Sequence, residues 1–208
     1  MSSLTMPPPA QTLTQALWPR PAARPLAWGR DAALVLTFSL LTAVAAQINL
    51  HLLLVPITGQ TFAVLLTGAL LGPRLGALAM AAYLLEGLAG LPVFAEGRSA
   101  WSPSNIPLLP TILGPTAGYL FSYPFAAGLV GALAGRGWDR RPATMLAAML
   151  LGSVVIYAGG AGWLAHYIGL HRALLLGVAP FVGGDAVKAL AAAALLPAGW
   201  KLLGTRRG

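Results

Sequence analysis

Two ionisable residues stand three positions apart in an apolar stretch near the end of the chain. The segment FVGGDAVKAL, residues 181–190, contains Asp185 and Lys188, and the apolar run AAAALLPAGW follows it. On a helix these two positions share one face, so the carboxylate and the ammonium group can pair. Charges inside a membrane usually face the interior of a bundle and often mark a substrate path, which predicts a ligand site here. The alternative is an ion pair that only orients the helix.

A second polar group lies in VPITGQT, residues 55–61. Thr58, Gln60 and Thr61 stand at the expected start of a helix, and their side chains can donate and accept hydrogen bonds. We predict that Thr58 and Gln60 contact the ligand. Ordinary capping of the helix by Thr58 is the alternative reading.

Glycines beside these polar residues indicate close approach of a ligand or of another helix. Gly184 precedes Asp185 and leaves room for a ligand near the acid. In LGPTAGYLFSY, residues 113–123, Gly118 and Tyr119 can form one wall of the same pocket. Packing of helices through small residues explains Gly118 equally well.

Catalysis has little support in the residue pattern. Ser122 and His166 can be imagined as a protease pair, but no glycine–serine elbow accompanies the serine. The three histidines lack the i, i+4 spacing of metal ligands, and no GxxxxGK[ST] motif is present for ATP hydrolysis. We therefore expect no catalytic residues, no metal site and no cofactor, with an intramembrane enzyme that uses Asp185, His166 or Ser122 as the alternative.

The composition is that of an integral membrane protein. Hydrophobic residues make up 57% of the 208 positions and charged residues only 9%, whereas soluble domains carry about a quarter charged residues. The net charge is +8, but the basic residues occur in short clusters between apolar segments. That distribution fits membrane topology in a lipid bilayer better than nucleic-acid binding, so we expect no nucleic-acid partner.

Apolar runs and Gly/Pro punctuation predict an all-α protein with six transmembrane helices. We expect a flexible cytoplasmic tail over residues 1–28, a membrane domain over 29–201 and a second cytoplasmic tail over 202–208. The segment HLLLVPI, residues 51–57, is expected to fold inward as a re-entrant-like first external loop, because the helix after it is too short to span the bilayer. The six helices are predicted at 31–50, 58–71, 73–90, 111–134, 142–168 and 183–201, with a short segment at 171–179.

The basic residues predict the orientation of these helices. With six spans, ten basic residues fall on the side of both termini and two, Arg98 and Arg172, on the other side. The positive-inside rule then places both termini in the cytoplasm. The ten residues are Arg20, Arg24, Arg30, Arg74, Arg136, Arg140, Arg141, Lys201, Arg206 and Arg207.

Four segments together resemble one known family. They are the run from VPITGQT to GLPVFA (residues 55–95), LGPTAGYLFSYPFAAGLVGAL (113–133), GWLAHYIGL (162–170) and LGVAPFVGGDAVKALAAA (176–193). In sequence and order they resemble the BioY family, the biotin-specific substrate-binding (S) components of energy-coupling-factor (ECF) vitamin transporters. The resemblance covers nearly all of residues 43–196.

The resemblance implies a six-helix bundle with a ligand pocket near the external face. The family's acid and lysine at the start of the last helix correspond to Asp185 and Lys188. An asparagine in the loop between the third and fourth helices has Asn105 as its counterpart here. Some members have an arginine directly after the GY of the fourth helix, where this chain has Leu120.

The chemistry of biotin agrees with these residues. Its ureido ring carries two N–H donors and a carbonyl acceptor, which a carboxylate and an ammonium group can bind. Phe94 is suited to contact the apolar thioether ring. The alternative within the same fold is another vitamin or a precursor such as dethiobiotin.

The resemblance further implies partners and a location. The expected partners are an ECF transmembrane coupling protein and two cytoplasmic ATPases. The expected location is the cell membrane of a bacterium, which the chain crosses several times.

Overall fold

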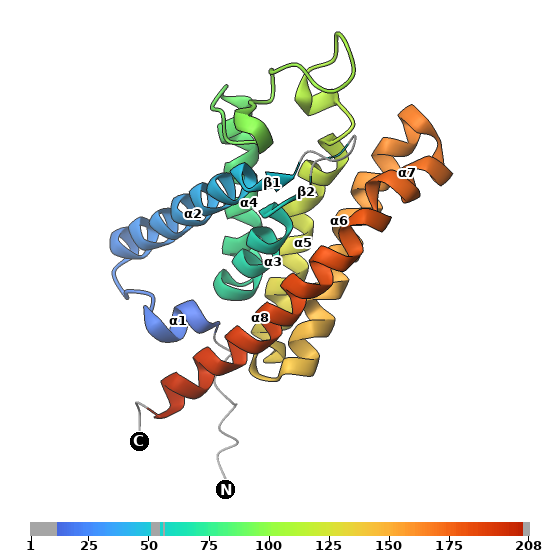
Figure 1. The fold of residues 1–208 in the computed structure, drawn as a ribbon. Coiled ribbons are helices and arrows are strands. Elements are labelled where there is room, and N and C mark those ends of the chain that lie inside the picture. Colours follow the sequence, from blue (N-terminus) through green and yellow to red (C-terminus); the bar gives the residue numbers. More distant parts are fainter. Residues whose placement is uncertain (1–11, 51–54, 56, 206–208) are drawn as a thin grey trace, which may run out of the picture.

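The computed structural model describes residues 12–50, 55 and 57–205, and its architecture is helical (Figure 1). Predictions that fall on residues 1–11, 51–54, 56 and 206–208 lie outside this part of the chain. The α-helices are α1 (Leu13–Leu17), α2 (Arg24–Gln47), α3 (Gln60–Leu71), α4 (Pro73–Leu88), α5 (Ala117–Gly135), α6 (Pro142–Ile168), α7 (Leu170–Gly177) and α8 (Ala179–Thr205). Three short 3-10 helices accompany them: η1 (Ala95–Gly97), η2 (Thr111–Leu113) and η3 (Trp138–Arg140).

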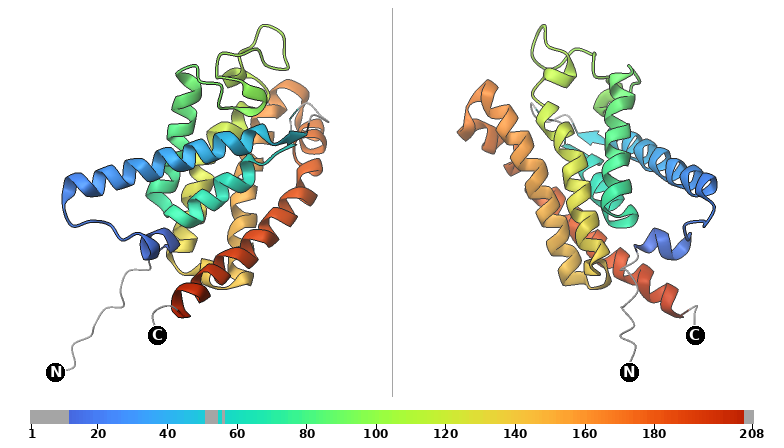
Figure 2. Two further views of the ribbon diagram at one scale, coloured as in Figure 1. Left: turned by 60° about the vertical axis from the view of Figure 1, so that its left-hand side comes forward. Right: turned by 180° about the vertical axis from the view of Figure 1, so that it is seen from behind.

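Helix α5 occupies the centre of the bundle. It packs against α3 and α4 on one side and against α6 on the other, while α8 lies against α6. Helix α2 contacts α4 and α3 and crosses the bundle at a steep angle (Figures 1 and 2). Helix α1 and the end of α8 lie at one end of the bundle, and the loop between α4 and α5 lies at the other (Figure 1).

In the described part of the chain four helices, α2, α5, α6 and α8, are long and apolar enough to cross a membrane. Helix α4 has 16 residues and α3 only 12, so α3 rises about 18 Å, less than a hydrocarbon core. The predicted all-helical membrane architecture is confirmed at this level, and the count of six spans stays a prediction.

Several predicted boundaries are correct and others are displaced for identifiable reasons. The starts at Pro73 and Pro142 agree with the structure, because proline fits the first turn of a helix. The helix predicted at 111–134 is divided into η2 and α5, since Pro115 keeps Gly114 in an extended conformation. The last helix begins at Ala179 rather than at Gly183.

The prediction of a flexible tail over residues 1–28 is wrong from residue 12 onward. Helix α2 begins at Arg24, seven residues before the predicted Asp31, with Pro25 in its first turn. Helix α1 packs on α3 and α8. The guanidinium group of Arg30 is buried, donates to the carbonyl oxygen of Trp18 and pairs with Asp31 at 2.9 Å. Together these contacts attach the segment before α2 to the bundle.

The prediction of a tail over residues 202–208 is wrong for residues 202–205, because α8 continues to Thr205. Near this end, the indole N–H of Trp200 donates to Asp139 Oδ2 at 2.6 Å, and Arg140 lies 4.9 Å from the centre of the indole ring. Asp139 is fully buried in η3, and this burial raises the pKa of its carboxyl group. The contact holds the last turns of α8 against the connection between α5 and α6.

A short antiparallel pairing precedes α3. Strands β1 (Asn49–Leu50) and β2 (Ile57–Thr58) pair residue 49 with 58 and residue 50 with 57. The predicted re-entrant loop at 51–57 falls mostly outside the described residues. The pairing, which the sequence did not indicate, brings the end of α2 beside the start of α3.

Glycine permits a close approach between α3 and α5. A Cβ atom on Gly68 of α3 would lie 2.2 Å from the carbonyl oxygen of Ala127 in α5. Interhelical packing at this distance requires that neither helix present a side chain there. The contact fixes α3 against the central helix.

We expect Gly68→Ala to lower stability by about 1–3 kcal/mol, because the added methyl group overpacks the contact between α3 and α5. Gly128→Ala is the matched control, since its Cβ would meet only Ala77 Cβ at 3.8 Å and Pro73 O at 3.9 Å. That control should be neutral or stabilising by up to about 1 kcal/mol through helix propensity. Thermal unfolding of both variants in detergent measures the difference, and equal behaviour would contradict the packing argument.

Candidate functional site

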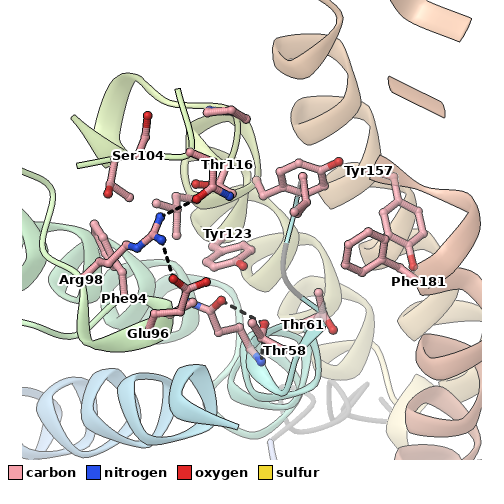
Figure 3. A pocket seen from close by; sticks show the side chains of 18 residues that line it. Thr58, Thr61, Phe94, Glu96, Arg98, Ser104, Thr116, Tyr123, Tyr157 and Phe181 are labelled. Carbon is pink, nitrogen blue, oxygen red and sulfur yellow. Dashed lines mark hydrogen bonds and ion pairs between the residues drawn. The ribbon is translucent and has the colours of Figure 1, made fainter. Parts of the chain in front are cut away.

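A pocket opens between the starts of α3 and α5, under the loop that connects α4 to α5 (Figure 3). It holds about 750 Å³ of space, including the part open to solvent. Its walls come from the start of α3, the loop after α4, and helices α5, α6 and α8. The lining combines aromatic side chains with a few hydroxyl, amide and charged groups, which suits a small organic molecule.

Thr58 and Gln60, two residues of the predicted site, form the wall of the pocket at the start of α3. The hydroxyl group of Thr58 donates to Gln60 Oε1 at 3.0 Å and accepts from the backbone N–H of Gln60 at 3.2 Å. Gln60 Nε2 donates to the hydroxyl oxygen of Tyr83 at 2.6 Å, and Tyr83 donates to the carbonyl oxygen of Val93 at 3.0 Å. These bonds connect the start of α3 to the loop that covers the pocket.

The predicted pairing of Asp185 with Lys188 is present, with Lys188 Nζ 2.8 Å from Asp185 Oδ1. Thr61 donates to the same oxygen at 2.9 Å, and Tyr157 donates to Oδ2 at 2.6 Å. Lys188 also donates to the carbonyl oxygen of Thr58 at 2.9 Å. Both carboxylate oxygens of this buried acid therefore have partners, as a charge in apolar surroundings requires.

The pair does not itself line the main pocket. Asp185 and Lys188 border a smaller adjoining space, together with Thr61, Met149 and Ser153. Thr61 lines both spaces, and Tyr157 lines the main one. The carboxylate of Asp185 is therefore connected to the main pocket by the hydroxyl groups of Thr61 and Tyr157, which donate to it.

Three further predicted residues line the pocket. Phe94 packs edge-on against Tyr83 with ring centres 5.3 Å apart. Tyr119 donates to the carbonyl oxygen of Gly177 at 2.7 Å and faces Phe181. Asn105 contributes from the loop after α4 and accepts a hydrogen bond from Arg98 at 3.1 Å.

Two predicted glycines do not line the pocket. A Cβ on Gly118 would lie 2.3 Å from Trp163 Cβ and 2.4 Å from the carbonyl oxygen of Gly159, so this glycine serves the packing of α5 against α6. Gly184 is exposed, and a Cβ there would meet no atom within 4 Å. The prediction that these glycines shape the site is not supported by their positions.

Several pocket residues were missing from the predicted site. Tyr123 follows Tyr119 by four positions on α5, a spacing that places both rings on one face. Tyr157, Phe181, Glu96 and Arg98 also line the pocket. Arg98 entered the sequence argument only as one of two external basic residues, and nothing in the local sequence connects Tyr157 to Asp185.

Comparison with known protein families shows to which family this chain belongs. A model of the BioY family matches residues 16–205. The chain belongs to the BioY family.

Named relatives agree with this membership. A protein of Pyrococcus horikoshii named a probable biotin transporter BioY is 40% identical over 163 residues, which is 78% of this chain and 91% of that protein. The biotin transporter BioY of Thermotoga maritima is 37% identical over 157 residues, 75% of this chain and 87% of the relative.

The fold is shared with a solved structure. The crystal structure of the S-component for biotin from an ECF-type ABC transporter matches with a TM-score of 0.70 at 23% identity, and the match covers 86% of this chain and 95% of the other. This likeness confirms the arrangement of helices in a BioY-family chain.

We expect Tyr157→Phe to destabilise the protein by about 1.5–3 kcal/mol, because Asp185 loses a hydrogen bond to a charged group. Tyr167→Phe is the matched control, since the hydroxyl of Tyr167 is exposed and donates only to the carbonyl oxygen of Leu113. That change should cost little, as water can replace the bond. Thermal unfolding in detergent without added ligand tests the contrast, and similar shifts in both variants would remove the special role given to Asp185.

Proposed function

We propose that this BioY-family chain is the biotin-binding subunit of a vitamin uptake transporter in the cell membrane. The main support is the polar end of the pocket, where two hydroxyl groups that line it donate hydrogen bonds to the buried carboxylate of Asp185. The family membership and the names of the relatives support biotin as the ligand.

The ureido ring of biotin suits the hydroxyl groups of Thr61 and Tyr157. Each hydroxyl hydrogen points to Asp185, which leaves oxygen lone pairs to accept the two ureido N–H groups. A short rotation of either side chain would let Asp185 accept an N–H directly. Lys188 offsets the charge of the acid, and its ammonium group donates to Asp185, to Thr61 and to the carbonyl oxygen of Thr58.

The apolar part of biotin suits the aromatic walls. Phe94 and Phe181 lie on different sides of the pocket, with Tyr123 between them (Figure 3). Aromatic faces and edges make favourable contacts with sulfur and with aliphatic rings. Dethiobiotin offers the same ureido group without the thioether, so it should bind less tightly and serves as a comparison ligand.

The proposed assembly joins this chain to an ECF transmembrane coupling protein and two cytoplasmic ATPases. The structural neighbour is the S-component of such a transporter. The sequence has no GxxxxGK[ST] motif of its own, so the energy of ATP hydrolysis would come from the partners.

The enzyme alternative would use Asp185, His166 or Ser122, and the last two border one space between α5 and α6. The hydroxyl group of Ser122 donates to the carbonyl oxygen of Tyr119 in its own helix at 2.6 Å. Asp185 is bound by Thr61, Tyr157 and Lys188. A nucleophile beside a base is what catalysis would require. Neither residue provides that arrangement.

Purified protein should bind about one biotin per chain, and Asp185→Asn should lower the affinity roughly tenfold to hundredfold. Asparagine keeps the shape but loses charge-assisted bonds and leaves Lys188 uncompensated. Lys188→Met should also weaken binding, because it removes the positive charge beside Asp185. The helix should stay intact, since methionine is similarly long and is tolerated in helices. Titration calorimetry measures each affinity, with dethiobiotin as the second ligand.

The same variants discriminate binding from scaffolding. If Asp185 only orients α8, its variants will show a lower Tm but near-normal affinity in the protein that remains folded. A well-folded wild-type protein that shows neither heat of binding nor thermal stabilisation with biotin would overturn the proposed function.

We further propose six spans with both termini in the cytoplasm, supported by the ten-to-two count of basic residues. The chain has no cysteine, so single cysteines can report on each side. Leu108→Cys, in the exposed loop between α4 and α5, should react with a membrane-impermeant maleimide in intact cells. Arg140→Cys, in η3, should react only after the cells are opened, and the reverse pattern would refute the orientation.

A further inference from the structure

One cationic side chain, Arg98, lies among the described residues that line the pocket. It comes from the loop between η1 and η2. Figure 3 places it with Phe94 and Glu96 across the pocket from Tyr157 and Phe181. The end of the pocket near Asp185 thus accepts hydrogen bonds, whereas the end near Arg98 carries a positive charge.

Arg98 already holds a carboxylate. Its Nη2 lies 2.5 Å from Glu96 Oε2, and its Nη1 donates to Asn105 Oδ1 at 3.1 Å. The Arg98 side chain is 29% exposed and that of Glu96 is 18% exposed, so the pair stands at the border between pocket and solvent. A guanidinium group is suited to carboxylates because its planar fork can bind both oxygens.

The backbone around this pair is a tight turn with defined attachments. Phe94 and Arg98 form a backbone bridge, with the N–H of Phe94 donating to the carbonyl oxygen of Arg98 at 2.8 Å. The side chain of Gln47 in α2 donates to the carbonyl oxygen of Phe94 and accepts from the N–H of Gly97, both at 3.0 Å. The turn is therefore tied to a long helix rather than suspended in the loop.

Glu96 occupies an unusual conformation within that turn. Its φ is +65°, in the left-handed region that residues other than glycine seldom adopt. Such conformations persist where the surrounding structure holds them, and they concentrate at ligand sites. Here the turn holds the Glu96 carboxylate against Arg98 at the border of the pocket.

We propose that the Arg98–Glu96 pair is an exchangeable ion pair, in which the carboxylate of the ligand displaces Glu96 and binds to Arg98. This inference rests on the proposed biotin function, because biotin carries its polar ring and its carboxylate at opposite ends. Arg98 stays paired with a carboxylate throughout, and Glu96 moves from the border of the pocket toward solvent. Glu96 then competes with the ligand and lowers the affinity for anionic ligands only.

The test compares biotin with biotin methyl ester, which lacks the negative charge. Arg98→Gln should weaken binding of biotin roughly tenfold to hundredfold and leave binding of the ester nearly unchanged. Glu96→Gln should tighten binding of biotin several-fold, because a neutral hydrogen bond from Arg98 to glutamine competes with the ligand less strongly than the ion pair with Glu96 does. The affinity for the ester should again stay unchanged. Arg172→Gln, a change at an exposed cation on α7, is the control for general electrostatic attraction and should alter neither affinity.

Calorimetric titration of each variant with both ligands gives the decisive ratios. Equal losses of acid and ester binding in Arg98→Gln would make Arg98 a scaffold of the loop and overturn the proposal. Weaker biotin binding in Glu96→Gln would overturn the exchange. If Arg98→Gln does not fold, Glu96→Gln alone decides, because only exchange predicts a gain for the acid and none for the ester. Wild-type protein that binds neither ligand would instead refute the proposed function.

Discussion

A carboxylate buried among apolar helices imposes the main constraint on this molecule. Asp185 is 6% exposed, and an ionised group in such surroundings is tolerated only with several hydrogen-bonding partners. Those partners come from three places: Thr61 at the start of α3, Tyr157 on α6, and Lys188 on α8 itself. Satisfying one acid therefore fixes the mutual positions of three helices at the level of the pocket.

Elsewhere in the bundle, close packing at glycine accompanies polar contacts between helices such as that of Gln60 with Tyr83. Glycines let α3 approach α5 at Gly68 and let α5 approach α6 at Gly118. In a membrane the lipid is as apolar as the helix surface, so close packing replaces the hydrophobic effect as the source of association. The hydrogen bonds around Asp185 then select the relative position of the helices, since these bonds form only in one register.

The sequence was sufficient for much of the fold because its main signals are local. Apolar runs bounded by Pro73, Pro142 and Gly169 mark helix ends, and the i, i+3 spacing of Asp185 and Lys188 placed them on one face. Pro25 was misleading, because a proline in the first turn of a helix resembles the prolines of an irregular tail.

The site was predicted in part. Thr58, Gln60 and Tyr119 lie in recognisable motifs, but Tyr157 is 28 positions from Asp185 and only the packing of α6 on α8 joins them. Arg98 and Glu96 depend on a left-handed turn that composition does not reveal.

The residue at which α3 begins affects the size of the molecules that the pocket can admit. Its first residues, Gln60 and Thr61, form part of the pocket wall, so the depth available to a ligand depends on where the helix begins. Each residue transferred between the helix and the preceding loop would move that wall by about 1.5 Å along the helix axis. The helices that carry Asp185 and Tyr157 would not have to move. Ligand size can therefore diverge among related chains through small insertions and deletions before α3, within the limit set by the hydrogen bond of Thr61 to Asp185.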